Sequence, residues 1–179
     1  MYKGTNRTAC TSQKLIAEAL LELLNDSSFQ SISVASICRR ADVSRQTFYS
    51  LFESKENVIL YELSKSCAFD LAGDGSEDLT LSQLARSYSR YLTSHKAFLA
   101  TLVNNGIIHY MYDQQYQSLI RCTCFMSGSS MEDRCFTADF MASGMTSIAR
   151  SYIMSGARED EEYLEKMICS LFSGRMLRF

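Results

Sequence analysis

The segment from Ser33 to Lys55 constrains this chain most, because it has the pattern of two short helices joined by a tight turn. Apolar residues recur at helical spacing just after Ser33: Val34, Ile37, Cys38 and Ala41. Asp42 and Val43 follow as the turn, and Ser44 is placed to cap the next helix. The segment therefore predicts a helix-turn-helix, the motif that places its second helix in the major groove of DNA.

The composition predicts an all-α protein with a sizeable core. Of the 179 residues 46% are hydrophobic and 21% charged, so the chain can bury a core of one domain or two small ones. It has no proline and only 8 glycines, which favours helices joined by short loops. No apolar run approaches the ~20 residues that span a bilayer, so we expect no membrane segment and a cytoplasmic protein.

The first helix is expected from Thr11 or Ser12, as its cap, to about Leu24. One stripe of that helix is apolar: Leu15, Ile16, Ala19, Leu20, Leu23 and Leu24. Phe29 and Ile32 can close the edge of the same small core before Ser33 caps the second helix. Together these helices and the third predict a DNA-binding domain over residues 1–56, with a basic arm at 1–10.

The third helix offers polar side chains to DNA. Phe48 can point back to the first helix, which leaves the neighbouring polar residues on the outer surface. An arginine can bond a guanine edge bidentately and a glutamine can pair with adenine, so Arg45 and Gln46 are the candidates for reading bases. Hydroxyls and ammonium groups suit phosphate oxygens. The predicted DNA-binding residues are Ser33, Ser44, Arg45, Gln46, Thr47, Tyr49 and Lys55.

The order of these residues resembles the N-terminal domain of the TetR family of bacterial regulators. The matching pattern is a leucine-rich helix, Ser-Val-x-x-Ile-x-x-x-Ala, Val-Ser-x-x-Thr-Phe-Tyr and then Phe-x-Ser-Lys-Glu, over about residues 10–60. The resemblance implies that Thr47 and Tyr49 touch phosphates and that Lys55 clamps the DNA backbone. Asp42 departs from it, since the family usually has glycine in this turn; aspartate tolerates left-handed backbone, but its charge opposes DNA.

A second helical domain is expected over residues 57–179. Ser54 caps a fourth helix that runs through Val58 and Leu63 toward Cys67 and Phe69 or Leu71, and residues 73–78 make the clearest loop. Further helices are expected at about 80–94, 96–104, 107–125, 134–155 and 160–173.

Aromatic residues, methionines and both histidines gather in this second domain, which suggests a pocket for a small-molecule effector. The candidates for its lining are Tyr88, His95, Phe98, His109, Tyr110, Tyr116, Phe140 and Met141. A stripe of aromatic residues and methionines is also typical of an ordinary hydrophobic core. The resemblance supports the existence of a pocket, since TetR-like second domains commonly bind a small molecule.

The last two helices are expected to form a homodimer interface, because small residues allow close approach and a second apolar stripe follows. The candidates are Gly144, Ile148, Tyr152, Leu164, Ile168 and Leu171. Both stripes could instead face the domain's own core.

The distribution of charge and the spacing of the cysteines add little to the prediction of function. Residues 1–56 hold seven Lys and Arg against six Asp and Glu, and residues 57–179 hold eleven against fourteen. In the basic arm, Lys3 and Arg7 have no neighbouring acid. The seven cysteines show no zinc spacing, so we expect no metal or cofactor; Cys122 and Cys124 with Cys135 remain open as a redox or soft-metal sensor.

The sequence therefore predicts a homodimeric regulator that binds a palindromic operator in double-stranded DNA. We expect a repressor that a small molecule releases from DNA. The alternative is a DNA-binding adaptor without such a ligand, controlled by a protein partner. An enzyme is not expected, because no nucleophile motif, phosphate loop or placed carboxylate pair occurs.

Overall fold

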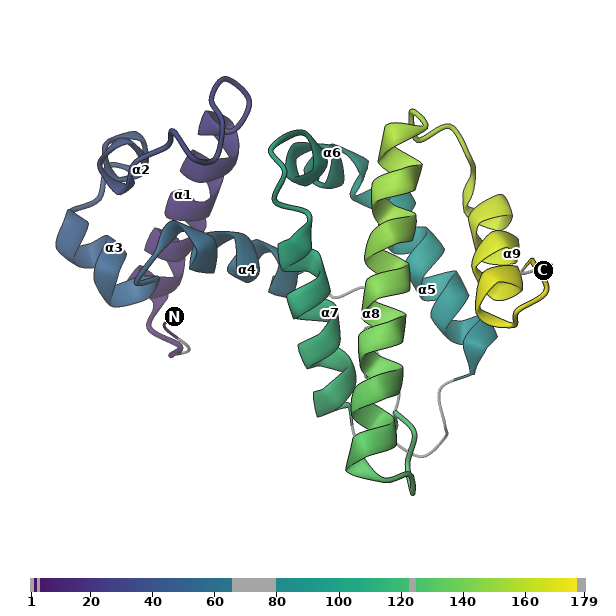
Figure 1. Ribbon diagram of the computed structural model, residues 1–179. Coiled ribbons are helices and arrows are strands. Elements are labelled where there is room, and N and C mark those ends of the chain that lie inside the picture. Colours follow the sequence, from purple (N-terminus) through teal and green to yellow (C-terminus); the bar gives the residue numbers. More distant parts are fainter. Residues whose placement is uncertain (1, 3, 66–79, 123–124, 177–179) are drawn as a thin grey trace.

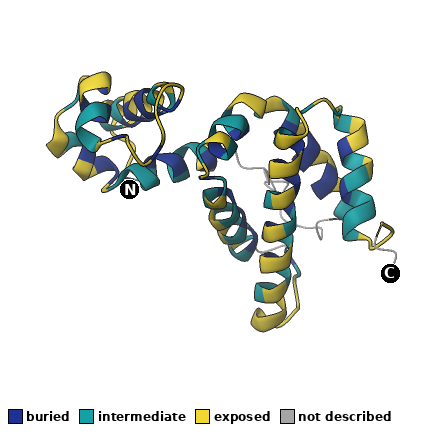
Figure 2. Ribbon diagram, turned by 45° about the horizontal axis from the view of Figure 1, so that its top comes forward, coloured by how far each residue is buried: buried dark blue, intermediate teal, exposed yellow. Residues whose placement is uncertain are grey.

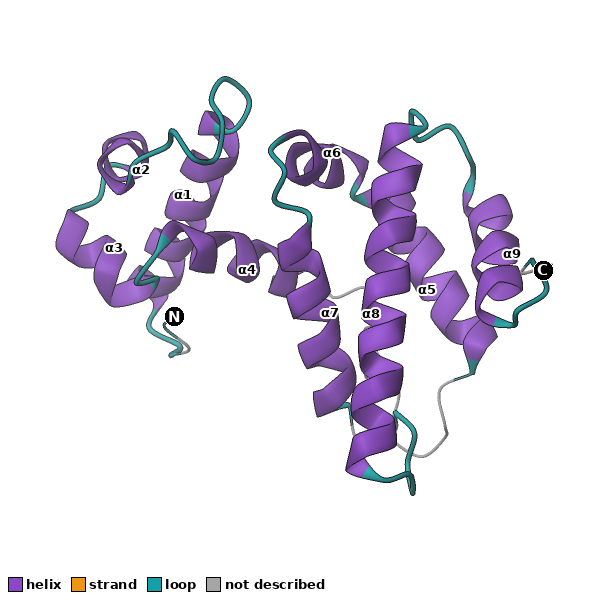
Figure 3. Ribbon diagram, in the orientation of Figure 1, coloured by secondary structure: helices purple, strands orange, loops and turns teal. Residues whose placement is uncertain are grey.

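The structure is a computed structural model that describes residues 2, 4–65, 80–122 and 125–176, and its regular elements there are all α-helices (Figure 3). This confirms the expected all-α fold. Figure 1 shows an N-terminal group of helices and a larger C-terminal group, with one helix running between them. The helices are α1 (Arg7–Leu23), α2 (Val34–Ala41), α3 (Arg45–Leu51), α4 (Lys55–Lys65), α5 (Leu81–Ser94), α6 (Lys96–Asn104), α7 (His109–Arg121), α8 (Met131–Met154) and α9 (Glu161–Phe172).

Helix α1 begins earlier than predicted. Asn6 is the cap, and its Oδ1 accepts from the backbone N–H groups of Thr8 and Ala9 at 3.0 and 3.2 Å. The expected cap at Thr11 or Ser12 is wrong, because Thr11 lies inside the helix and donates to the Arg7 carbonyl four residues back. Leu15, placed in the apolar stripe, is 44% exposed.

The caps of α2 and α3 lie where the sequence places them. Ser33 Oγ accepts from the Ser36 N–H at 3.1 Å, and Ser44 Oγ accepts from the Thr47 N–H at 3.0 Å. Between the helices Asp42 takes the left-handed conformation, with φ 52° and ψ 47°. Each hydroxyl satisfies an N–H that the first helical turn leaves free, which fixes where each helix starts.

Helix α4 lies between the two groups of helices (Figure 1) and packs against both α1 and α7. Ser54 Oγ accepts from the Asn57 N–H at 3.3 Å, and Val58, Ile59 and Leu63 are buried. The expected continuation toward Cys67, Phe69 or Leu71 and the loop at 73–78 lie outside the described residues. The domain boundary between 56 and 57 stays a prediction.

Four of the C-terminal helices differ from the expected ranges by a few residues, where their caps lie. Thr80 and Gln83 form a capping box before α5, and Ser130 starts α8 three residues earlier than expected. Helix α7 is shorter than the predicted 107–125, because Cys122 is already extended. Asp160 caps α9.

The buried apolar residues form one cluster that runs through both groups of helices (Figure 2). In the C-terminal group α9 packs on α5 and α7 packs on α8. Tyr88 lies at the centre: it is fully buried and its hydroxyl donates to the Met145 carbonyl at 2.6 Å. No described helix is long and apolar enough to cross a membrane.

Candidate DNA-binding site

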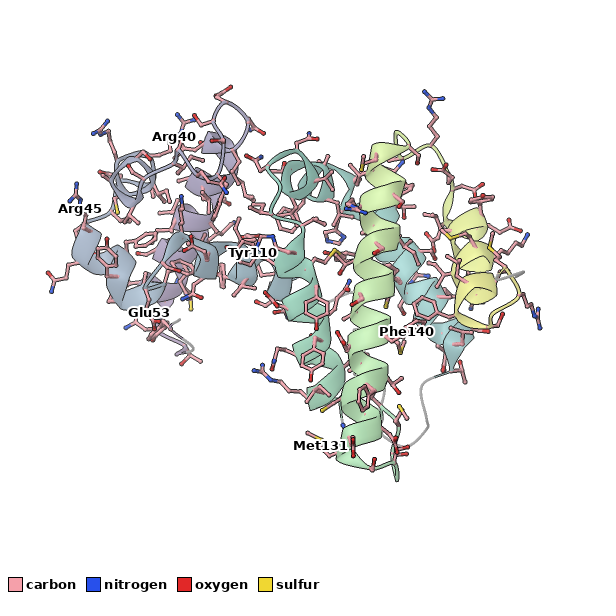
Figure 4. All side chains as sticks on the ribbon, in the orientation of Figure 1. Arg40, Arg45, Glu53, Tyr110, Met131 and Phe140 are labelled. Atoms are coloured by element: carbon pink, nitrogen blue, oxygen red, sulfur yellow. The ribbon has the colours of Figure 1, made fainter. Side chains whose placement is uncertain are left out.

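Helix α3 divides its side chains between core and surface. Phe48 and Leu51 are buried, and the Phe48 ring contacts Phe52 with 6.1 Å between centroids. Arg45 and Gln46 in its first turn are exposed. Figure 4 shows Arg45 at the outer edge of the N-terminal group, directed away from the rest of the chain. The helix therefore presents a guanidinium and an amide at its solvent end, where a DNA groove can reach them.

Tyr49 is the third exposed side chain of this surface. It is 52% exposed, and its ring meets the edge of the Phe48 ring at 5.6 Å. The contact holds the phenol ring against the domain, and the exposed half of the side chain can meet a phosphate.

The predicted hydroxyl contacts are partly used within the domain. Ser33 and Ser44 act as helix caps, and Ser44 Oγ lies 2.9 Å from Thr47 Oγ1. Serine and threonine oxygens have further hydrogen-bonding capacity, so a cap can also meet a phosphate. These three residues are positioned at the starts of α2 and α3.

Sequence reasoning overlooked two arginines at the end of α2. Arg39 and Arg40 are exposed, and Arg40 Nε lies 2.6 Å from Glu22 Oε2 on α1. With Arg45 they add positive charge beside α3, against the carboxylate of Asp42 at the turn. Buried nearby, Cys38 has a raised thiol pKa because of desolvation, which the guanidinium of Arg45 partly offsets.

Lys55 is placed differently from what the resemblance implies. Its ammonium donates to the carbonyls of Phe29 at 2.6 Å, Ile32 at 2.9 Å and Gln30 at 3.4 Å. It also lies 4.5 Å from the centre of the Phe29 ring. All three ammonium donors are thus directed at the loop between α1 and α2 rather than left free for a phosphate.

The N-terminal arm is also held, at least at Tyr2. The Tyr2 N–H donates to the Leu51 carbonyl at 2.8 Å, and Gln13 Nε2 donates to the Tyr2 carbonyl at 3.1 Å. Arg7, expected in the arm, is the first residue of α1, and Lys3 lies outside the described residues. The expectation of a basic arm over 1–10 is therefore corrected: Tyr2 bonds to α3 and α1, and residues from Arg7 onward are helical.

The predicted ligand residues do not gather at one place. Tyr88 is core, and a hydrogen bond from Gln115 Nε2 at 3.4 Å joins its hydroxyl to α7. Thr146 on α8 donates to Gln115 Oε1 at 3.1 Å, so these buried polar groups satisfy one another. Burial raises the pKa of the Tyr88 phenol.

The other candidates for that lining lie on several sides of the C-terminal group. His95 stacks on Tyr91 at 4.6 Å where α5 meets α6, and His109 is exposed beside Tyr110, where α7 faces the N-terminal helices. The remaining ones are dispersed: Phe98 is half-buried on α6, Met141 is half-buried on α8, and Tyr116 and Phe140 line two different grooves. The sequence could not show this, because a face becomes a pocket only through tertiary packing.

The first groove lies between α7 and α8 and encloses about 520 Å³. Tyr112 and Tyr116 line it with Phe136, and the Tyr112 hydroxyl donates to Asp139 Oδ1 at 2.7 Å. That bond is the main reason why the pKa of Tyr112 is raised to about 12.

The second groove, of about 590 Å³, lies between α8 and α9 and is mostly apolar. Five of the six predicted interface residues line it: Gly144, Ile148, Tyr152, Leu164 and Leu171. Ile168 is fully buried and does not line the groove. Phe140, assigned to the ligand pocket, is 66% exposed here and meets the edge of Phe172 at 6.0 Å.

Four of the described cysteines are free thiols: Cys10, Cys38, Cys135 and Cys169. Within the part of the chain that the structure describes, no three His, Cys, Asp or Glu side chains are placed to hold a metal ion. The alternative of a thiol sensor involves Cys124, which lies outside that part.

Comparison with known proteins agrees with this geometry. Residues 16–61 match the family model described as bacterial regulatory proteins, tetR family. The HTH-type dhaKLM operon transcriptional activator DhaS of Lactococcus lactis subsp. lactis (strain IL1403) is 23% identical over an alignment of 160 residues that covers 85% of this chain and 84% of DhaS.

Two crystal structures have the same fold along nearly the whole chain. Lin0861 from Listeria innocua has a TM-score of 0.81 at 20% identity, covering 99% of this chain and 97% of its own. A TetR transcriptional regulator from Streptococcus agalactiae 2603V has a TM-score of 0.61 at 20% identity, covering 93% and 96%.

The helix-turn-helix and the family match over residues 16–61 are those of a DNA-binding transcriptional regulator. The family match over residues 16–61 confirms, for that segment, the resemblance to the TetR family seen in the sequence.

Proposed function

We propose that the protein is a homodimer that reads a palindromic operator with α3, using Arg45 and Gln46 on base edges. One observation carries this proposal: the Ser44 cap and the buried Phe48 fix α3 while its first turn stays exposed. A recognition helix held in this way enters the major groove with its N-terminal residues foremost. Thr47, Tyr49 and the caps then lie beside phosphates.

The α8–α9 groove is the proposed dimer interface. Its aromatic side chains are exposed in one chain, with Phe140 at 66% and Tyr163 at 58%. Gly144 lies between them and leaves room in the groove, since a Cβ at this position would lie 3.2 Å from the Phe172 ring. Two copies related by a two-fold axis can cover each other's apolar surface here.

Control by a protein partner is better supported than control by a ligand in the predicted pocket. The predicted lining residues are scattered, and the buried polar groups around Tyr88 bond one another. A repressor that a small molecule releases from DNA remains the alternative proposal.

The direction of regulation has one specific support. The relative DhaS is named an activator, so activation becomes a second candidate beside the repression expected from the sequence. Transcription in vitro from a promoter that carries the operator separates the two, because added protein raises the transcript in one case and lowers it in the other. Since its target is bacterial DNA, we propose that the protein acts in the cytoplasm.

The experiment that tests the readout compares Arg45→Ala with Arg150→Ala, which removes an exposed arginine of α8. On an operator selected with the wild type, Arg45→Ala lowers affinity by about 1–3 kcal/mol, because it loses a bidentate base contact. Its melting temperature and dimerisation stay those of the control. Equal operator binding by the two variants would remove Arg45 from the readout set.

A further inference from the structure

The loop between α1 and α2, residues 24–33, is held from both groups of helices. It ends at Ser33, the cap of α2, so any movement of the loop moves the start of the helix-turn-helix. Phe29 and Ile32 anchor it, at 4% exposure each. The loop is also bonded internally, since the Ser28 carbonyl accepts from the Ser31 N–H at 3.0 Å.

From the N-terminal side, Lys55 holds the loop through the carbonyls of Phe29 and Ile32. Because Lys55 is the first residue of α4, the start of the connecting helix and the start of α2 are fixed to each other. An ammonium with three carbonyl acceptors is a stable arrangement, since charge-assisted hydrogen bonds are stronger than neutral ones.

From the C-terminal side, the loop is held by Asn105, which ends α6. Its Oδ1 accepts from the Phe29 N–H at 3.1 Å, and its Nδ2 donates to the Leu24 carbonyl at 3.5 Å. The same Nδ2 donates to the Thr101 carbonyl of α6 at 3.0 Å. One amide thus bonds both the loop and its own helix.

The Phe29 ring adds a second contact at this junction. It meets the edge of the Tyr110 ring on α7 at 6.2 Å between centroids, while the Lys55 ammonium lies over it. Phe29 therefore contacts α4, the end of α6 and α7 with its carbonyl, its N–H and its ring. Figure 4 shows Tyr110 on the side of α7 that faces the N-terminal helices.

We infer that Asn105 is a positioning residue for DNA recognition: it latches the α1–α2 loop to the α6–α7 turn and so sets the angle of the helix-turn-helix on the second domain. This inference rests on the proposed function. It gives the second domain a connection to α2 that is separate from the covalent path through α4. An effector or partner that moves the α6–α7 turn changes the orientation of α3 by this route.

The experiment uses the full chain with Asn105→Ala and, as a matched control, Asn104→Ala, which removes the neighbouring exposed amide of α6. Hydrogen exchange is measured over residues 25–41. In Asn105→Ala the Phe29 amide and the start of α2 exchange about five- to twentyfold faster, while α5 and α8 are unchanged. Exchange equal to that of the control would overturn the latch.

A second arm tests positioning rather than local structure. Binding is measured to the selected operator and to versions with one base pair added or removed between the half-sites. The wild type discriminates against the altered spacings, whereas Asn105→Ala loses about five- to twentyfold of that discrimination, since its reading heads are no longer held at one angle. Faster loop exchange with unchanged spacing discrimination would overturn the positioning role.

The two proposals fail in different ways. If the wild type selects no DNA sequence, the proposed function is wrong, and the exchange arm still decides whether Asn105 holds the loop. If the wild type selects a palindrome and Asn105→Ala treats all spacings as the wild type does, only the latch is wrong.

Discussion

Asp42 is the residue where this chain departs from the TetR-family pattern that its N-terminal helices resemble. Its φ of 52° is one that glycine adopts without strain, and aspartate tolerates it better than most residues. The turn therefore keeps its shape, and the remaining effect of Asp42 is its negative charge beside α3.

We predict that Asp42→Asn strengthens binding to the operator and to unrelated DNA alike, about two- to fivefold at low salt, because asparagine keeps the left-handed backbone and removes the charge. The matched control is Asp113→Asn on α7, far from α3 along the chain and exposed. Titrations of labelled DNA at several salt concentrations measure the effect. Equal gains in the two variants would show that net charge, rather than the turn, is responsible.

Lys55 can be tested separately for a structural role and for a contact to a DNA phosphate. We predict that Lys55→Met lowers the free energy of unfolding by about 1–3 kcal/mol, since it leaves carbonyls of the α1–α2 loop without their donor. Lys14→Met, at a side chain 69% exposed, is the control. Denaturant unfolding gives the energies.

The salt dependence of DNA binding decides between the two roles of Lys55. With the ammonium directed into the loop, the slope of log affinity against log salt stays that of the wild type. A slope reduced by about one, with unchanged stability, would instead identify Lys55 as the phosphate clamp that the resemblance implies.

Helix α8 carries two exposed phenylalanines, and each lines a different groove. Phe140 lines the α8–α9 groove and Phe136 the α7–α8 groove, with 66% and 68% exposure. We predict that Phe140→Glu makes the protein monomeric at micromolar concentration and weakens operator binding, whereas Phe136→Glu leaves the dimer intact. Sedimentation equilibrium measures both. A dimeric Phe140→Glu variant would remove the α8–α9 groove from the interface.

Elements with local causes were predictable from the sequence. The caps at Ser33 and Ser44 start α2 and α3 as expected, because a hydroxyl bonds an N–H three residues away. The start of α1 was missed because Asn6 competes with Thr11 as a cap, and periodicity alone does not choose between them. The predicted lining of a ligand pocket does not come together for a different reason. Tyr88 and Phe140 were grouped because both are aromatic, but Tyr88 is buried in the core and Phe140 is exposed on the α8–α9 groove.

For the whole molecule, the contacts that join the two groups of helices were beyond sequence reasoning. Nothing in the spacing of Phe29, Lys55 and Asn105 shows that they meet, since 76 residues separate Phe29 from Asn105. The residues proposed to read DNA lie within one short sequence motif, so the sequence could indicate them. The contact between Phe29 and Asn105 forms only in the tertiary structure, so only the fold could show it.

We propose that this chain reads DNA as a symmetric dimer through α3. Selection of bound DNA from a random pool by the wild-type protein tests it most directly, with Arg45→Ala selected in parallel. We expect a palindrome whose half-sites lie about one helical turn apart or slightly more, and a loss of preference at one position of each half-site in the variant. A non-palindromic sequence, or the same preferences from both proteins, would contradict it.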